Sequence, residues 1–154
     1  LLQGLRGRLP APSIKVLREG RETLVGGTKV PMERVLDSRG VYVSGVLFGP
    51  VTIRDALEIG ARGLMVHHVE SGSIGESQEI AKSDLLESVD GTAVRSVDEL
   101  YARLADARRA GRRATLTFKR FSGGDTLFSY SQRALLVSEL RIIGPQNATL
   151  SAER

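Results

Sequence analysis

Few side chains in this sequence could perform covalent chemistry. The nearest approach to a serine nucleophile is Ser122, in the stretch Ser-Gly-Gly-Asp, and the two histidines are the neighbours His67 and His68. A serine nucleophile needs a histidine base that a carboxylate orients. The two histidines fall in a predicted strand, where adjacent side chains point to opposite faces. Because Ser122 also falls on a predicted hairpin turn, we expect no catalytic triad and no enzymatic activity in this chain.

The sequence offers equally little for a metal or a cofactor. It contains no cysteine, which excludes disulfides, thiolate zinc sites and cysteine nucleophiles together. Two adjacent histidines would need carboxylates to complete a metal site. The aspartates best placed in motifs, Asp84 and Asp90, are expected to hold turns rather than to act as a general acid and base. We therefore expect no metal site and no cofactor.

The 154 residues have a composition typical of a globular protein, with 41% hydrophobic and 26% charged residues. This length suffices for one domain, or for one domain and a fragment of another. No stretch approaches the roughly 18 consecutive apolar residues of a membrane-spanning helix, and the first residues lack a signal-peptide pattern. The net charge is +4, and the densest basic stretch, 108–113, suits the C-terminal end of a helix. Aromatic residues are scarce, at 5%, so we expect no nucleic-acid partner. Because a long apolar stretch is lacking, we also expect no membrane span.

Residues 1–30 predict a strand hairpin followed by a linker. Strand-like runs at 14–17 and 23–25 flank a turn that contains Gly20. The run Lys-Val-Leu-Arg at 15–18 resembles Thr-Phe-Lys-Arg at 117–120, and a glycine and a Thr-Leu pair follow each run. This partial repeat suggests two copies of one module, the first represented only by its end. Chance similarity of two hairpins is the alternative.

Residues 31–143 alternate between strand and helix signals and are expected to form the main domain, while residues 144–154 are expected to fray. A capping box, Ser96 with Glu99, predicts the start of the longest helix, and Gly111 predicts its end. The expected elements are a strand over 41–48, a helix over 53–59, a strand over 63–69, helical turns within 74–81, a hairpin over 85–94, a helix from 97 and strands over 114–121 and 126–137.

Four pieces of the segment from 63 to 120 carry recognisable motifs: Val-His-His-Val-Glu-Ser-Gly-Ser at 66–73, Lys-Ser-Asp-Leu-Leu-Glu-Ser-Val-Asp-Gly-Thr-Ala-Val at 82–94, Ser-Val-Asp-Glu-Leu at 96–100 and Ala-Thr-Leu-Thr-Phe-Lys-Arg at 114–120. With these motifs, the segment resembles a PDZ domain of the bacterial HtrA/Deg-type serine proteases. Residues 66–73 are similar to a family strand that ends in a "V.pgSpA" turn, and residues 82–94 to "GDvIlsvdGxxV". Residues 96–100 are similar to "s.deL", which opens the family's groove helix. Residues 114–120 resemble the closing strand before an "R.G" turn. These pieces occur in the family's order and spacing.

The resemblance implies an α+β fold: a PDZ-like, five- to six-stranded antiparallel, partly open β-barrel or sandwich capped by two helices. In such domains an extended peptide adds as a strand to a sheet edge, loop N–H groups hold its carboxylate, and its last side chain enters an apolar pocket. Carried over to this sequence, the peptide-binding residues would be Gly45, Val46, Leu47 and Phe48 in the loop and strand, Leu100, Leu104 and Ala107 on the helix, and Arg108 at the entrance.

The implied function is that of a non-catalytic module that binds C-terminal or extended peptide segments and so regulates or targets an attached HtrA/Deg-like protease. Its implied partners are peptide or protein C-termini, the attached protease domain and neighbouring subunits. The family also implies a bacterial cell envelope or periplasm as the compartment.

Two departures from the family pattern leave an alternative open. Ser83 stands where the family usually has glycine before the aspartate. The candidate loop, 44–50, is similar to the "GLVFTP" run in second PDZ domains of some Deg proteases, but a predicted helix over 52–60 follows it. The alternative is a scaffold or oligomerisation domain whose groove is filled by its own chain. An open groove beside the helix 97–110 would favour peptide binding, and a groove occupied by residues 1–30 or 126–143 would favour the scaffold.

Overall fold

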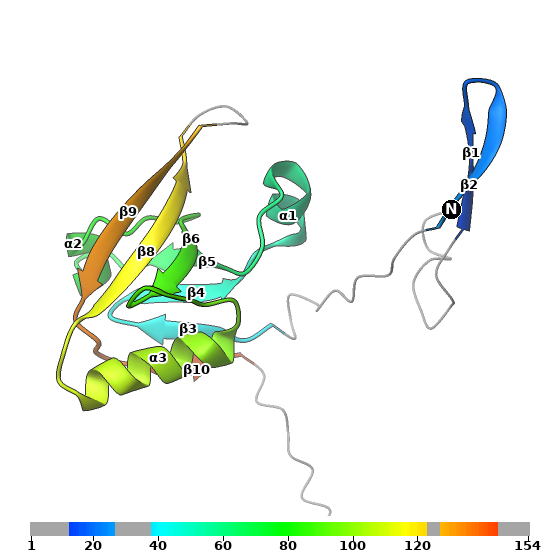
Figure 1. The fold of residues 1–154 in the computed structure, drawn as a ribbon. Helices are drawn as coiled ribbons and strands as arrows, with labels where there is room; N and C mark the ends of the chain where they lie inside the picture. The colour runs from blue at the N-terminus through cyan, green and yellow to red at the C-terminus, as the bar shows by residue number, and fades with distance from the viewer. Residues whose placement is uncertain (1–12, 27–37, 123–126, 145–154) are drawn as a thin grey trace, which may run out of the picture. The chain divides into compact units, whose positions relative to one another are not determined.

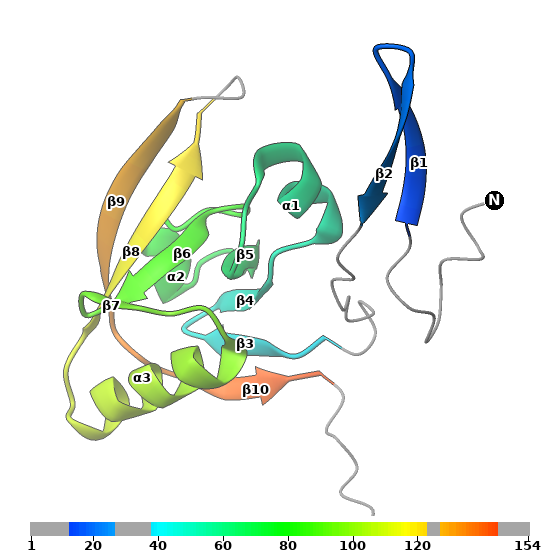
Figure 2. The ribbon, with the colours of Figure 1, turned by 45° about the vertical axis from the view of Figure 1, so that its right-hand side comes forward.

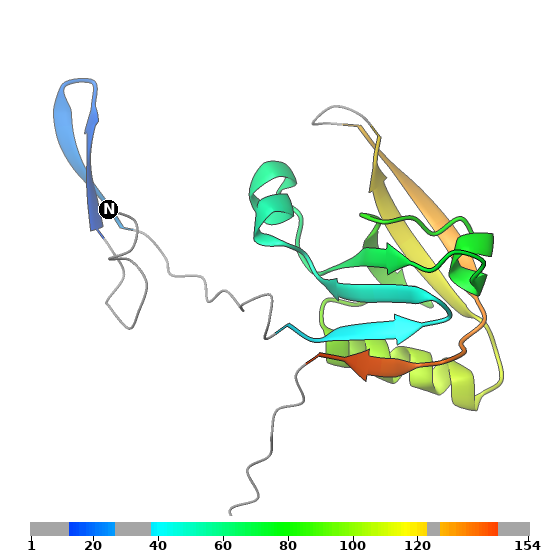
Figure 3. The same ribbon diagram turned by 180° about the vertical axis from the view of Figure 1, so that it is seen from behind.

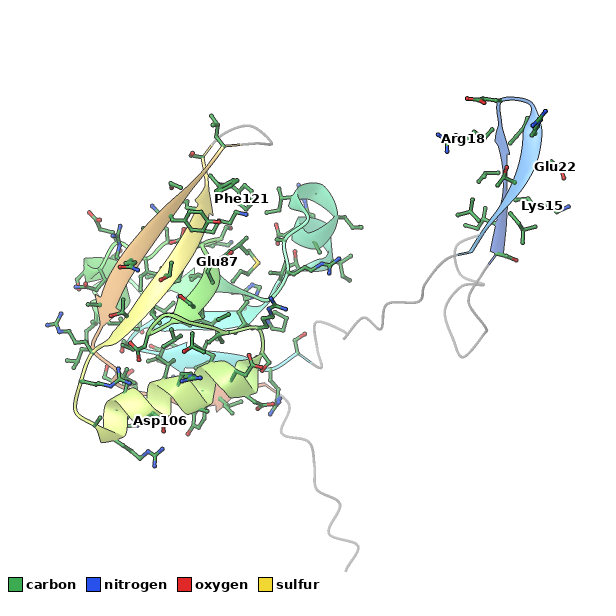
Figure 4. All side chains as sticks on the ribbon, viewed as in Figure 1. Lys15, Arg18, Glu22, Glu87, Asp106 and Phe121 are labelled. Atoms are coloured by element: carbon green, nitrogen blue, oxygen red, sulfur yellow. The ribbon has the colours of Figure 1, made fainter. Side chains whose placement is uncertain are left out.

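The computed structural model describes residues 13–26, 38–122 and 127–144. The chain divides into two compact units, Leu1–Met32 and Glu33–Arg154. The described part of the first unit is a hairpin of β1 (Ser13–Arg18) and β2 (Arg21–Gly26), as the sequence predicted. Lys15 of β1 forms an exposed ion pair with Glu22 of β2, and both are labelled in Figure 4.

The second unit is built on one antiparallel sheet of eight strands, in the order β10-β3-β4-β5-β6-β8-β9 (Figure 1). The short β7 pairs with β6 (Figure 2). The strands are β3 (Gly40–Val43), β4 (Val46–Pro50), β5 (Leu64–Val69), β6 (Leu85–Val89), β7 (Thr92–Ala93), β8 (Ala114–Phe121), β9 (Phe128–Leu135) and β10 (Arg141–Ile143). The described residues also form three helices, α1 (Ile53–Ile59), α2 (Ile74–Ser77) and α3 (Val97–Arg109). The predicted α+β class is confirmed. The sheet has eight strands where five to six were expected, and the described residues form three helices where two were expected. The sheet does not close into a barrel.

The main core lies between α3 and the sheet, against β3, β4 and β6 (Figure 2). The predicted helix face, Leu100, Leu104 and Ala107, is completely buried. Within the sheet, the rings of Phe48 and Phe118 stack with their centroids 6.2 Å apart. Full burial of each large apolar side chain stabilises the fold by about 1.5–3 kcal/mol, so this layer is the main source of the unit's stability.

The predicted helix signals act as expected. Ser96 Oγ accepts the N–H of Glu99 at 3.2 Å, and the Glu99 carboxylate accepts the N–H of Arg95 at 2.8 Å. The helix α1 occupies the predicted residues, from its cap at Thr52 to Gly60, which adopts the left-handed conformation that ends it.

One predicted strand is wrong. The apolar run 41–48 is not a single strand, because Ser44 and Gly45 form a two-residue turn that divides it into β3 and β4. Both residues have positive φ, 52° and 85°, as the tight turns of β-hairpins require. A further strand, β10, follows the predicted 126–137 strand region. The tail expected to fray lies outside the described residues, apart from Gly144.

The hairpin turn between β6 and β7 is held by Asp90. Its carboxylate accepts the N–H of Thr115 at 2.8 Å and the guanidinium of Arg112 at 2.6 Å. Burial acts to raise the pKa of Asp90, but the Thr115 N–H and the Arg112 guanidinium together outweigh burial and lower this pKa below its ordinary value of 3.8. The ionised carboxylate therefore stabilises the fold above the unfolded pKa, and this contribution is lost as the pH falls through the lowered folded value.

We expect Asp90→Asn to lower the free energy of unfolding by about 1 kcal/mol at pH 7, because it removes a charge-assisted hydrogen bond. The difference from wild type should shrink as the pH falls from 4 to 2. Thermal unfolding of both proteins across this range measures it. Asp106→Asn is the matched control, because Asp106 forms only an exposed pair with Arg109 (Figure 4). An Asp90→Asn deficit that is equal at pH 7 and pH 2 would contradict the assignment.

Candidate functional site

The predicted peptide-receiving strand, β4, is paired along both edges. On one side Val46, Leu47 and Phe48 lie opposite Val43, Tyr42 and Val41 of β3. On the other side β4 pairs with β5. An added peptide strand needs a free sheet edge, and β4 has none.

The place next to β4 that a bound peptide would take is therefore held by β3. The strand β10 in turn pairs antiparallel with the outer side of β3, with Ile142 opposite Val41 (Figure 3). Both β3 and β4 contact α3. Val41 and Val43 of β3 are completely buried in the same core cluster as the helix face.

The structure brings together most of the predicted peptide-binding residues, but it brings them together as core. Val46, Phe48, Leu100, Leu104 and Ala107 are completely buried in one cluster. Gly45 is buried in the turn, and Leu47 is half-buried opposite His68. Arg108 is exposed near the end of α3. The cluster is thus filled by side chains of β3 and β4.

The turn between β3 and β4 is fixed by three other segments. Ser44 donates its N–H to the carbonyl of Ser138 at 2.9 Å, and its Oγ accepts the N–H of Ser138 at 3.0 Å. The carbonyl of Ser44 accepts the N–H of Gly75 at 2.9 Å, and the carbonyl of Gly45 accepts the N–H of Glu70 at 2.8 Å. The predicted carboxylate-binding turn is therefore bonded to the β9–β10 connection, to α2 and to the segment after β5.

Asp84 has the structural role that the sequence predicted, and it also has a partner that the sequence did not predict. It is 1% exposed, and its Oδ2 accepts the N–H of Ala81 at 2.9 Å. Arg120 binds it with two nitrogens, Nε at 2.6 Å and Nη2 at 2.7 Å. The hydrogen bonds that Arg120 donates to the Asp84 carboxylate raise the pKa of Arg120. This bidentate pair joins the start of β6 to β8, and Arg120 in the "R.G"-like turn was the available sequence signal.

The histidines have the placement that alternation in a strand predicts. His67 is half-buried and its Nε2 lies 2.9 Å from the carbonyl oxygen of Pro50, while His68 is exposed. Of the Ser122 motif, the structure describes Ser122, whose N–H bonds to the carbonyl of Leu127. Within the described ranges, no cluster of three or more His, Asp or Glu residues could hold a metal ion.

Comparison with protein-family models gives no match, and comparison with curated proteins gives none either. Among the residues that the structure describes, no helix combines the length and apolarity needed to cross a membrane. The geometry of β3, β4 and α3 therefore carries the functional argument.

The packing of the turn generates a specific prediction for Gly45. A Cβ added there would lie 2.1 Å from Cβ of Ser73, and the residue has a φ of +85°. We expect Gly45→Ala to lower the free energy of unfolding by about 2–4 kcal/mol, from backbone strain and overpacking together.

Gly111→Ala is the matched control, because Gly111 has a φ of +63° but open space around its Cβ position. It should cost only about 1 kcal/mol. Urea unfolding of the three proteins compares these values. Equal losses for the two variants would show that contact with Ser73 does not constrain the turn.

Proposed function

We propose that residues 38–144 form a PDZ-like, non-catalytic scaffold domain whose peptide groove is filled by its own chain. The domain would act within an HtrA/Deg-type protease by contacting neighbouring subunits or domains, without capturing free C-termini. The strand β3 between β4 and the edge strand β10 is the observation that carries this proposal.

The order of elements supports the PDZ-like part of the proposal. Strand β5, the short α2, the β6–β7 hairpin, α3 and β8 follow one another as the resemblance implied. The bidentate pair of Asp84 and Arg120 links two of the motifs on which the resemblance rests. This order of elements supports the proposal over residues 64–121.

The energetics of β3 favour a permanently filled groove over one that opens. Ejecting this strand would expose Val41 and Val43, each completely buried, at a cost of about 1.5–3 kcal/mol per side chain. It would also break two ladders of backbone hydrogen bonds, to β4 and to β10. A free peptide would have to replace all of these contacts.

We further propose that the β1–β2 hairpin is the end of a preceding PDZ-like module. Leu17 and Leu24 lie on one face of the hairpin. The other face is more apolar, because it carries Ile14 opposite Val25 and Val16 opposite Thr23. An isolated two-stranded hairpin is only marginally stable in water. In the partial repeat Val16 corresponds to Phe118, a core residue of β8, which supports a core-facing role for this face in a complete module.

The filled groove predicts how the full chain responds to peptides. Fluorescence polarisation with a library of hydrophobic peptides should show no saturable binding that needs a free C-terminus, when peptides with free and amidated C-termini are compared. Hydrogen exchange should find the amides of Val41 and Val43 protected to within about tenfold of those of Leu116 and Phe118, because all four open only with the core.

A disulfide-locked variant separates the filled groove from a peptide-binding one. Tyr42 and Arg141 are direct cross-strand partners, at a spacing that a disulfide can bridge. The chain has no other cysteine, so Tyr42→Cys/Arg141→Cys forms a single defined bond between β3 and β10. Free-carboxylate peptides that bind the wild type, and that lose binding on amidation or on oxidation of this variant, would overturn the filled groove and establish peptide capture.

A further inference from the structure

An apolar surface lies away from the filled groove, where α1 stands beside the end of β8. None of the residues of α1 is buried, although the helix carries Ile53, Leu57 and Ile59, and Leu57 is 80% exposed. Phe121 ends β8 on the side of α1 (Figure 4). We define the α1–β9 surface by the partly or largely exposed apolar residues Ile59, Phe121, Leu127, Phe128 and Tyr130, because Ile59 is the apolar residue of α1 that faces Phe121.

The aromatic part of this surface is organised. Phe121 lies directly opposite Phe128 in the β8–β9 ladder, and their rings meet edge to face with centroids 6.2 Å apart. Tyr130 meets Phe128 in the same way at 5.6 Å, and it is 61% exposed. Three of the seven aromatic residues of the chain thus gather on one side of the β8–β9 pair. A contiguous exposed apolar patch of this kind marks an interaction site.

A cleft opens between the two parts of the surface. It has a volume of about 260 Å³, and Ile59 of α1 and Phe121 of β8 line it together with Met65 and Lys82. Small-molecule sites are usually larger, roughly 300–1,000 Å³. The cleft therefore suits a single large apolar side chain of a partner.

Positive charges outnumber negative ones around the cleft, with Lys82, Lys119 and Arg120 against Asp55 and Asp84. Lys119 holds its ammonium 4.1 Å from the centre of the Phe128 ring and 5.5 Å from that of Phe121. Neither Lys119 nor Lys82 forms an ion pair within the described ranges. Of the carboxylates that line the cleft, Asp84 is paired with Arg120, and Asp55 is hydrogen-bonded to Thr52 at the start of α1.

We propose that the α1–β9 surface binds a peptide segment of a partner protein in which a large apolar residue is flanked by carboxylates. The apolar side chain would enter the cleft, and the carboxylates would contact Lys82 and Lys119. A second copy of this chain fits less well, because a symmetric contact would set the same lysines against each other. The site is separate from the filled groove. In β8, Lys119 and Phe121 lie on the opposite face of the sheet from the core residues Leu116 and Phe118.

The test uses the full chain and a defined probe, an acetylated and amidated peptide with a Phe-Leu pair flanked on both sides by glutamates. Nitrogen-15 HSQC titration should give saturable shifts in residues 53–59, 82 and 119–130. Phe128→Ser should weaken binding about tenfold, as loss of an aromatic anchor does. Lys82→Glu/Lys119→Glu should weaken it at least about fivefold. The same spectra report whether each variant is folded.

Two controls make the outcome decisive. The same peptide with lysines in place of its glutamates should not bind. Arg108→Glu reverses an exposed charge at the predicted groove entrance and should leave binding unchanged. A loss in this variant, with shifts confined to α3 and β3, would place the peptide in the groove and would overturn both this inference and the filled groove.

Three further results would overturn the inference alone: no saturable shift up to about 1 mM peptide, dimerisation that Phe128→Ser abolishes in sedimentation, or binding to anionic phosphatidylglycerol vesicles without binding to the peptide. Each leaves the hydrogen-exchange test of the groove unaffected, so the two proposals fail separately.

Discussion

The two-residue turn at Ser44 and Gly45 is the constraint on which the rest of this domain depends. It reverses the chain so tightly that β3 must lie antiparallel against β4, in the place where a peptide would otherwise add. Once β3 is there, its buried valines complete the core beneath α3, and its outer side becomes the edge to which β10 pairs. The hydrogen bonds that Ser44 forms with Ser138 and with Gly75 then hold the turn against the β9–β10 connection and against α2. A change in this one turn would therefore alter the groove, the core and the sheet edge together.

Much of the fold could be predicted from the sequence because its signals are local. Capping at Ser96, the left-handed residues at Gly60 and Gly111, and the Asp90-Gly91 turn each depend on residues within one or two turns of chain. The division of 41–48 was missed because six of its eight residues are β-branched, aromatic or aliphatic and favour an extended strand. In addition, Ser-Gly is a weaker turn signal than Asn-Gly or Asp-Gly. The pairing of β10 with β3 joins residues about a hundred positions apart, and no periodicity in either segment specifies that partner.

The candidate site shows the same limit. The apolar helix face at Leu100, Leu104 and Ala107 was predicted correctly, because a period of 3.6 residues identifies a buried face. Periodicity cannot identify what covers that face. A bound peptide and the strand β3 would bury it equally well, and only the three-dimensional pairing of β4 on both edges separates them. Arg120 was missed as the partner of Asp84 for a related reason, since their contact is set by the packing of β6 beside β8.

In the proposed scaffold, the tethering of β3 to β4 would keep free peptides out of the groove. A strand joined to its neighbour by two residues competes at an effective concentration far above the micromolar levels of free peptides, since short linkers alone reach about millimolar. A free peptide gains the same backbone hydrogen bonds as β3 but must also bear the entropy of association. In the proposed scaffold, the groove would thus be closed to free peptides by connectivity as much as by packing. Under the proposed function, a partner would have to bind apolar surface that the fold leaves uncovered. Ile59 of α1 and the aromatic residues at the β8–β9 end, with Lys119 held above Phe128, would supply both the apolar area and the charge for such binding.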